Sequence, residues 1–486
     1  MSRLTIAQAR LRMDDPHNCT DMNDVLTVLE AIYDALVRRD PVAGYAPALA
    51  TSWEVSDDAS IWLFHLRENV QFHDGTPLTA EAVIACLVRM ARPDMGVTLG
   101  APGVYAQYLA GAIFEAPTGM SVRISLAEPL ADLLDLLVYG YIAAPSCLEN
   151  PIKTPIGTGP YVFEHADATA IQVSANPDHY DGHPAHDAIT WLKIASAAGR
   201  LTALAEGHAD VANTLPFEAE APGARTGTYL SPTAVIYLFN SARGPLKDRR
   251  IRRALNLAID RQRLIADVLD GAGAPLHGLS SSAHMGYVPG DHFAYNHDEA
   301  RALLDDAGVA DGLTLDVDYP TSLPDEAEAL TEAVAGQLAS LNVHLRIRRH
   351  ENREAYAHMV RLSEIGDMCV FDSSPLSTFR VLYEKIDSRV GGSWWQGYSN
   401  TKVEALIDRA RRTPDSAARA VIFRDCNRLL TEDPPWLFLY NHLCTIGLHG
   451  DHPGWAMRRD GVLDVRALPR NLGGTYGKNG QGVYAR

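Results

Sequence analysis

The sequence lacks the signatures of several large protein classes. It has no run of about 18 apolar residues, so it predicts no transmembrane helix. Residues 1–10 contain no apolar h-region of a signal peptide, and Leu4–Ala7 already has the character of a first core strand. Two explanations stay open at this point: a leader that has been removed, or an unusual route of export.

Catalytic and nucleotide-binding motifs are also missing. Neither HExxH nor GxSxG occurs, and Gly157-Thr-Gly159 is followed by Pro160, which has no backbone N–H to offer a phosphate. The glycine-rich segment 473–478 fails the spacing of a P-loop. We therefore expect no enzymatic activity and no cofactor.

Cysteine is sparse and scattered. None of the six forms a CxxC pair, which disfavours zinc-ribbon and thioredoxin-like proteins. Most are expected to be small buried hydrophobic side chains. A Cys426–Cys444 disulfide would need an oxidising compartment, and the sequence alone does not establish it. The six are Cys19, Cys86, Cys147, Cys369, Cys426 and Cys444.

Positive charge is in deficit, with 43 basic against 60 acidic residues and a formal net charge of −17. This balance argues against nucleic acid or an anionic membrane as a main partner, and it favours solubility. The hydrophobic content of 47% is typical of a globular protein, and 486 residues exceed what one core accommodates. Two or three domains are expected.

Helical and strand-like patterns alternate along the chain, which predicts α/β domains. Asp248 is placed to cap the helix that buries Ile251, Ala254 and Leu255. The predicted helices are 201–209, 248–260, 298–307, 326–341, 401–409 and 416–430. The predicted strands are 161–163, 170–174, 189–194, 234–240, 313–318, 343–347 and 434–440.

Residues 47–88 have a distinctive order of elements. Trp62, Phe64 and Leu66 alternate as on a half-buried strand. A turn at His73-Asp74-Gly75 follows, and Thr79 can then cap a helix. This order resembles the inserted domain of extracytoplasmic solute-binding proteins of family 5, the peptide/nickel/opine-binding subunits of bacterial ABC importers. Further landmarks follow in the same order as in that family: 156–161, 176–180, 248–260, 297–308 and 397–400.

The resemblance implies the α/β fold of type II periplasmic binding proteins, with two lobes joined by a hinge and an extra domain inserted in the first lobe. Carried onto this chain, it predicts lobe I from residues 1–35, 155–240 and 445–486, the inserted domain from 36–154, and lobe II from 241–444. It also implies a periplasmic protein without its leader, which has been removed or replaced.

The function that the resemblance implies is capture of a small solute and its delivery to ABC permease subunits by a protein that is expected to be monomeric. Short peptides, opines and related zwitterionic or polyhydroxylated compounds are the expected solutes. Two alternatives stay open: a nickel, haem or metal-chelate binder, and a ligand sensor or enzyme on the same scaffold.

Asp372, Ser373 and Ser374 form the most suggestive polar site, because they end the apolar strand 368–371 and strand ends bind ligands in α/β proteins. In dipeptide-binding relatives an Asp near this position holds the ligand's amine. This chain lacks those relatives' Gly-Trp pair and second Asp-Pro, which puts a plain dipeptide in doubt. The alternative role of Asp372 is a helix cap or turn.

Other candidates accompany this strand end. Arg380 can clamp a carboxylate or pair with Glu384 one turn later. Aromatic side chains suit a pocket wall but also a core. The remaining expected ligand-binding residues are Trp394, Trp395 and Tyr398, His17, Asn18 and Thr20 after the first strand, and Tyr237 and Asn240 on the hinge strand.

Eighteen histidines raise the idea of a metal site. Two groups stand out, but both lie in segments rich in turn residues, and solvated loops are the favoured interpretation. The groups are His179, His183 and His186, and His277, His284, His292 and His297. We therefore assign no metal ligand.

Overall fold

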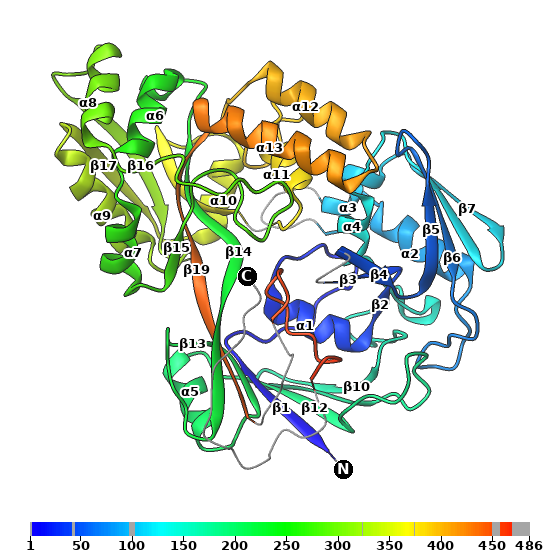
Figure 1. Cartoon of the computed structure of the whole chain (residues 1–486). Coiled ribbons are helices and arrows are strands. Elements are labelled where there is room, and N and C mark those ends of the chain that lie inside the picture. Colours follow the sequence, from blue (N-terminus) through cyan, green and yellow to red (C-terminus); the bar gives the residue numbers. More distant parts are fainter. Residues whose placement is uncertain are drawn as a thin grey trace. The chain divides into compact units, whose positions relative to one another are not determined.

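A computed structural model describes residues 2–40, 44–96, 103–322, 324–373, 375–449 and 457–468. The chain divides into two compact units (Figure 1). Unit 1 comprises Met1–Val97, Pro102–Tyr229 and Cys444–Arg486, and unit 2 comprises Thr98–Ala101 and Leu230–Leu443. The chain passes between them within strands β14 and β19, at Tyr229/Leu230 and Leu443/Cys444. The finer five-segment division stays a prediction.

Unit 1 is built on a mixed sheet. Strand β1 pairs in parallel with β12 on one side and with β13 on the other, and the C-terminal half of β19 runs antiparallel to β13. Helices α1 (Asn23–Ile32) and α5 (Ala197–Ala205) belong to the same unit. The strands, in sheet order, are β10 (Tyr161–Ala166), β11 (Ala170–Ala175), β12 (Ala188–Lys193), β1 (Arg3–Gln8), β13 (Val211–Leu215) and β19 (Trp436–His449).

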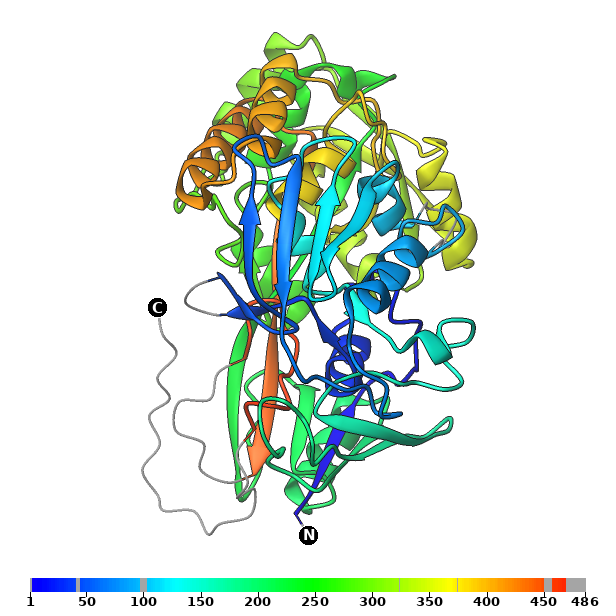
Figure 2. The same ribbon diagram turned by 90° about the vertical axis from the view of Figure 1, so that its right-hand side faces the viewer.

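A second sheet of unit 1 confirms the pattern predicted for residues 47–88. Trp62, Phe64 and Leu66 are all buried on one face of β6. Thr79 caps α2 (Ala80–Met90), since its Oγ1 accepts from the N–H of Ala82 at 3.2 Å. Figure 2 shows the strands side by side, in blue to cyan, with α2 next to them. In sheet order they are β5 (Ala50–Val55), β6 (Ile61–Leu66), β8 (Ser121–Ser125) and β7 (Ile113–Thr118).

The remaining elements of unit 1 are short. Two-stranded pairings join β2 to β9 and β3 to β4. They are β2 (Asp34–Ala35), β3 (Val37–Asp40), β4 (Gly44–Pro47), β9 (Tyr141–Ile142), α3 (Val104–Leu109) and α4 (Leu133–Leu137).

A late segment of the chain, residues 457–468, completes the core of unit 1. Val462 and Leu463 are buried, and the hydroxyl of Thr27 in α1 donates to the carbonyl of Leu463 at 2.8 Å. Arg458 and Arg466 each pair with a carboxylate from the first 34 residues: Arg458 with Glu30, and Arg466 with Asp34 at 2.9 Å. The first and last described parts of unit 1 are thus packed together.

Unit 2 has one sheet covered by helices. Strand β18 lies between β14 and β16, antiparallel to the first and parallel to the second. Helices α6 to α9 gather around β16 and β17, and α12 lies beside α13 (Figure 1). The strands are β14 (Ala224–Phe239), β18 (Met368–Ser373), β16 (Leu313–Pro320), β17 (Val343–His350) and β15 (Gly273–Pro275), which pairs with β19. The helices are α6 (Arg249–Leu257), α7 (Arg261–Leu269), α8 (His297–Asp306), α9 (Ala327–Ala339), α10 (Arg353–Arg361), α11 (Thr378–Lys385), α12 (Thr401–Arg411) and α13 (Ser416–Glu432).

The core of unit 2 forms where the sequence patterns predict it. Asp248 caps α6 through the N–H of Arg250 at 2.8 Å, and Ile251, Ala254 and Leu255 are buried against the sheet. At the start of α7 the buried guanidinium of Arg261 donates to three backbone carbonyls at 3.1 Å or less, one of them that of Asn256 near the end of α6. Helix α6 is therefore fixed both by its apolar stripe and by polar contacts at its end.

All six cysteines are free thiols, so the Cys426–Cys444 disulfide does not form in this structure. Within the described ranges, no helix has the length and apolar character that crossing a bilayer requires.

Candidate functional site

The end of β18 places the predicted polar residues at the edge of the unit 2 core. Met368 and Val370 point into that core, and Asp372 follows them on the same face by the two-residue period of a strand. Phe371 and Ser373 occupy the other face. Ser374 lies outside the described residues.

Asp372 is a carboxylate surrounded by basic groups. Burial raises its pKa, and the charges that oppose this effect are those of Arg353, Lys385 and His442. It does not cap the following helix, because Ser377 does so: the Oγ of Ser377 accepts from the N–H of Arg380 at 3.1 Å. Asp372 is therefore available to accept hydrogen bonds from a bound group.

Arg353, which the sequence analysis did not single out, opens α10 directly after β17. Its Nε and Nη1 are buried and have no hydrogen-bond partner in the described part of the chain. Its Cζ lies 5.4 Å from the ring centre of Phe371 and 5.7 Å from that of Tyr356. Buried donors without partners are rare, because each costs about 1–3 kcal/mol. A bound acceptor would remove this cost.

Aromatic rings extend the surroundings of Arg353. The ring of Trp394 lies 4.3 Å from that of Phe371, centre to centre, at an angle of 39°. Trp394 is only partly buried, as suits a wall residue. Arg353, Phe371, Trp394 and Asp372 thus place a cation, an apolar surface and a carboxylate in one region of unit 2.

Two further cations near the strand end have partners within the protein. Arg380 donates from Nε to the carboxylate of Glu384 at 2.9 Å, the i,i+4 pair that the sequence analysis held as the alternative to a clamp. Lys385 is buried and donates to the hydroxyl of Ser373 at 3.2 Å. Ser373 and Lys385 therefore orient each other beside Asp372.

Other predicted residues of unit 2 are held in structural contacts. The hydroxyl of Tyr237, deep in the core, donates to Thr331 at 2.9 Å, and Asn240 donates to the carbonyl of Gly366 at 3.0 Å. Trp395 donates from Nε1 to the carbonyl of Tyr398 at 2.6 Å, while the buried Tyr398 donates to the carbonyl of Asp433 at 3.0 Å. None of the hydrogen bonds made by these four side chains in the described ranges involves Asp372.

His17, Asn18 and Thr20 lie in a loop of unit 1 that follows β1. Nδ1 of His17 lies 2.9 Å from the guanidinium of Arg89, so it must accept, and Nε2–H then donates to the carbonyl of Tyr141 at 3.1 Å. Burial, followed by the charge of Arg89, lowers the pKa of His17 to about 4. Asn18 donates to Asp14 at 2.9 Å, and Thr20 accepts from the N–H of Met22 at 3.1 Å.

The histidine groups do not converge. His277 lies 2.7 Å from Asp291, whereas His284, His292 and His297 contact Pro375, Val288 and Ser340 respectively. His179 lies near Asp34, His183 contacts the carbonyl of Pro184, and His186 contacts Ser2. Among the described residues, no three His, Cys, Asp or Glu side chains are grouped so as to hold a metal ion.

The mixed sheets, their strand order and their flanking helices define a type II periplasmic binding protein, the fold class that the sequence predicted. Solved structures with the same fold include HbpA2 from Haemophilus parasuis, with a TM-score of 0.83 at 20% identity over 96% of this chain and 99% of that one. AgaA in complex with agropinic acid, from A. tumefacien R10, has a TM-score of 0.77 at 22% identity over 96% of both chains.

The chain belongs to the bacterial extracellular solute-binding proteins, family 5, whose middle-region sequence model matches residues 44–376. The glutathione-binding protein GsiB of Salmonella typhimurium is 26% identical over 449 residues, covering 87% of this chain and 85% of GsiB. GsiB of Pectobacterium atrosepticum is also 26% identical, over 448 residues. The predicted family is confirmed, and the chain is a solute-binding protein that serves an ABC transporter.

Proposed function

We propose that the captured solute is a short peptide or amino-acid conjugate that carries both an ammonium and a carboxylate group. Asp372 accepts hydrogen bonds from the ammonium group, and Arg353 donates to the carboxylate. Phe371 and Trp394 supply the apolar surface against which the solute packs. The protein performs no chemistry on the solute, acts as a monomer in the periplasm, and passes the solute to membrane permease subunits.

The observation that carries this proposal is the guanidinium of Arg353. Its buried Nε and Nη1 are charged donors without partners in the described residues, and a carboxylate oxygen is the strongest acceptor that a bound solute could bring to either of them. The rings of Tyr356 and Phe371 lie beside it, and a charged hydrogen bond is stronger in such apolar surroundings than in water.

The relatives support the same class of solute. GsiB is named for glutathione binding, and the ABC transporter-associated periplasmic binding protein DppA from Helicobacter pylori was solved with the peptide STSA. The H. pylori protein has a TM-score of 0.77 at 20% identity over 96% of this chain. A peptide ligand therefore occurs both for a sequence relative of this chain and for a solved structure with the same fold.

Calorimetric titration with glutathione and with Ala-Ala-Ala tests the proposal. Amidating the C-terminus of Ala-Ala-Ala, or acetylating its N-terminus, should each weaken binding, because each change removes one charged partner. Arg353→Gln should weaken binding by about 10- to 100-fold, as expected for a hydrogen bond between charged groups of about 1.5–3 kcal/mol. In Asp372→Asn, acetylating the N-terminus of the peptide should cause little further loss of affinity, whereas amidating its C-terminus should still weaken binding.

The matched control is Arg361→Gln, which removes a guanidinium from the other end of α10. Full affinity of Arg353→Gln for a peptide that the unaltered protein binds would refute the assignment of Arg353. Failure of both peptides to bind would contradict the peptide class, and native mass spectrometry of protein purified without refolding would then identify the retained solute.

A further inference from the structure

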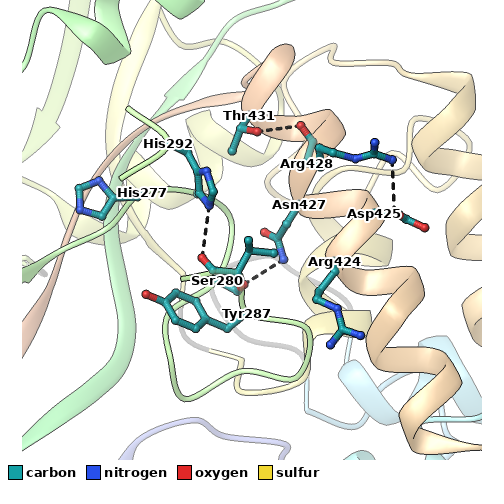
Figure 3. Close-up of a pocket in the computed structure, with 11 residues that line it drawn as sticks. His277, Ser280, Tyr287, His292, Arg424, Asp425, Asn427, Arg428 and Thr431 are labelled. Carbon is teal, nitrogen blue, oxygen red and sulfur yellow. Dashed lines mark hydrogen bonds and ion pairs between the residues drawn. The ribbon is translucent and has the colours of Figure 1, made fainter. Parts of the chain in front are cut away.

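Unit 2 contains a cavity of 390 Å³ that lies apart from Asp372 and Arg353. It lies between the segment 277–292 and helix α13, as Figure 3 shows. Its volume falls at the lower end of the range of small-molecule sites, about 300–1,000 Å³. Its lining includes His277, Gly278, Ser280, Tyr287, Arg424 and Arg428.

The charge of the lining is mainly positive. Arg424 and Arg428 stand one turn apart on α13, and Asp425 is the carboxylate that lines the cavity with them. Asp425 lies 3.2 Å from Nη2 of Arg428, so one negative charge is shared with that arginine. The guanidinium of Arg424 has no hydrogen-bond or ion-pair partner in the described ranges. A solvent-exposed cation without a partner in these ranges therefore lies at the wall of the cavity.

One uncharged donor adds to this preference for an anion. The hydroxyl of Ser280 already accepts from Asn427 at 3.1 Å, so its own proton is free to be donated to a ligand. His277 lies 2.7 Å from Asp291 through Nδ1, and burial lowers its pKa, so it adds no positive charge to the lining.

The other walls are apolar or aromatic. The ring of Tyr287 and the side chain of Val288 line the cavity, and Gly278 leaves space because it has no side chain. Figure 3 shows Tyr287 on the loop that faces α13, so the aromatic wall and the arginines come from different elements. Such a lining suits a ligand with an apolar body and a single anionic end.

We propose that this cavity is a second binding site, which takes a small organic carboxylate with a flat apolar body. The carboxylate pairs with Arg424, and the body lies against Tyr287 and Val288. The site is separate from the solute site, because none of the residues assigned to solute binding lines it. A carboxylate at this position would bind whether or not a peptide is present.

The test is a ¹⁹F NMR titration of the full chain with 4-fluorophenylacetate and, separately, with the uncharged 4-fluorophenylacetamide. The carboxylate should bind at least about tenfold more tightly than the amide, the ratio expected for loss of one charged hydrogen bond. Arg424→Gln should weaken binding of the carboxylate about tenfold and leave binding of the amide unchanged.

Three variants separate this site from its alternatives. Gly278→Val should weaken both compounds by filling the cavity; a Cβ at Gly278 would meet Thr431 at 3.7 Å and Asn427 at 3.8 Å, which are ordinary contacts that permit folding. Arg409→Gln, an exposed arginine on α12, should change nothing. Arg353→Gln should leave the dependence of binding on Arg424 unchanged, so failure of the peptide proposal would leave this one standing.

Four results would overturn the inference: equal binding of the acid and the amide, full binding of the acid to Arg424→Gln, loss of binding in Arg353→Gln, or displacement of 4-fluorophenylacetate by an equal concentration of inorganic phosphate. The last result would show that the apolar body contributes nothing.

Discussion

Replacing Arg261 by methionine should strongly destabilise unit 2. The side chain of Arg261 is only 4% exposed, and no carboxylate pairs with it in the described ranges. Its Nε donates to the carbonyl of Phe438 at 2.8 Å, and its Nη1 donates to those of Phe293 at 3.0 Å and Asn256 at 3.1 Å. Burial lowers the pKa of Arg261 to about 10, so the group still carries its charge at pH 7.

The magnitude follows from the carbonyls that would lose their donor. Methionine preserves the apolar stem but leaves up to three buried acceptors without this partner, at about 1–3 kcal/mol each. Relief from burying a charge offsets part of this loss. We expect a net loss of about 3 kcal/mol, which for a unit of this size lowers Tm by roughly 6–12 °C.

Differential scanning calorimetry measures the effect, and Arg263→Met supplies the control from the same helix. Arg263 has a side chain that is 72% exposed and pairs with Asp267 across one turn, so its loss should cost less than about 0.5 kcal/mol. Hydrogen exchange of the peptide 436–440 should accelerate in Arg261→Met alone. If the two variants melt together, buried carbonyl contacts of this kind do not stabilise unit 2.

Other expectations concern unit 1 and helix α9. Burial and the charge of Arg89 lower the pKa of His17 to about 4, from about 6.5 in an unfolded chain, so the unfolded state takes up the proton first as pH falls. Stability should therefore decrease between pH 6.5 and pH 4 by about 3 kcal/mol through this group, and His17→Gln should flatten that part of the pH profile in urea unfolding. An unchanged slope would contradict the buried, neutral state of His17. Gly157→Ala should destabilise unit 1 by about 2–3 kcal/mol, because the new Cβ would lie 2.1 Å from the carbonyl oxygen of Ile32. Gly336→Ala in α9 should instead stabilise by about 0.5–1 kcal/mol, since nothing lies within 4 Å of its Cβ. Thermal melts that rank these two glycine variants in the opposite order would refute the steric argument.

Much of the fold was predictable because local signals and tertiary packing agree. The alternation of Trp62, Phe64 and Leu66 and the caps at Thr79 and Asp248 all appear in the structure as the patterns indicated. Strand β14 was predicted from residue 234 but begins at Ala224. Its first ten residues are polar or mixed and contain Pro232, so pairing with neighbouring strands, and not apolar periodicity, maintains the strand there.

The candidate site was harder to predict than the fold. Asp372 carried a signal, a carboxylate at the end of an apolar strand, whereas Arg353 carried none beyond its place just after Asn352, which caps α10. What distinguishes Arg353 is the burial of two donor atoms against rings from Phe371 and Tyr356. Such an arrangement depends on residues brought together by folding, and a linear pattern does not reveal it.

The packing of residues 457–468 against α1 bears on the order in which the protein can be made. Unit 1 cannot close its core until Leu463 and Arg466 have been synthesised, although its first strand appears at the very start of translation. Unit 2 contains nearly all of its sequence between Leu230 and Leu443, so it can fold while unit 1 still waits. The half that begins first is therefore finished last, and a nascent chain interrupted before residue 457 would expose the apolar surface of α1.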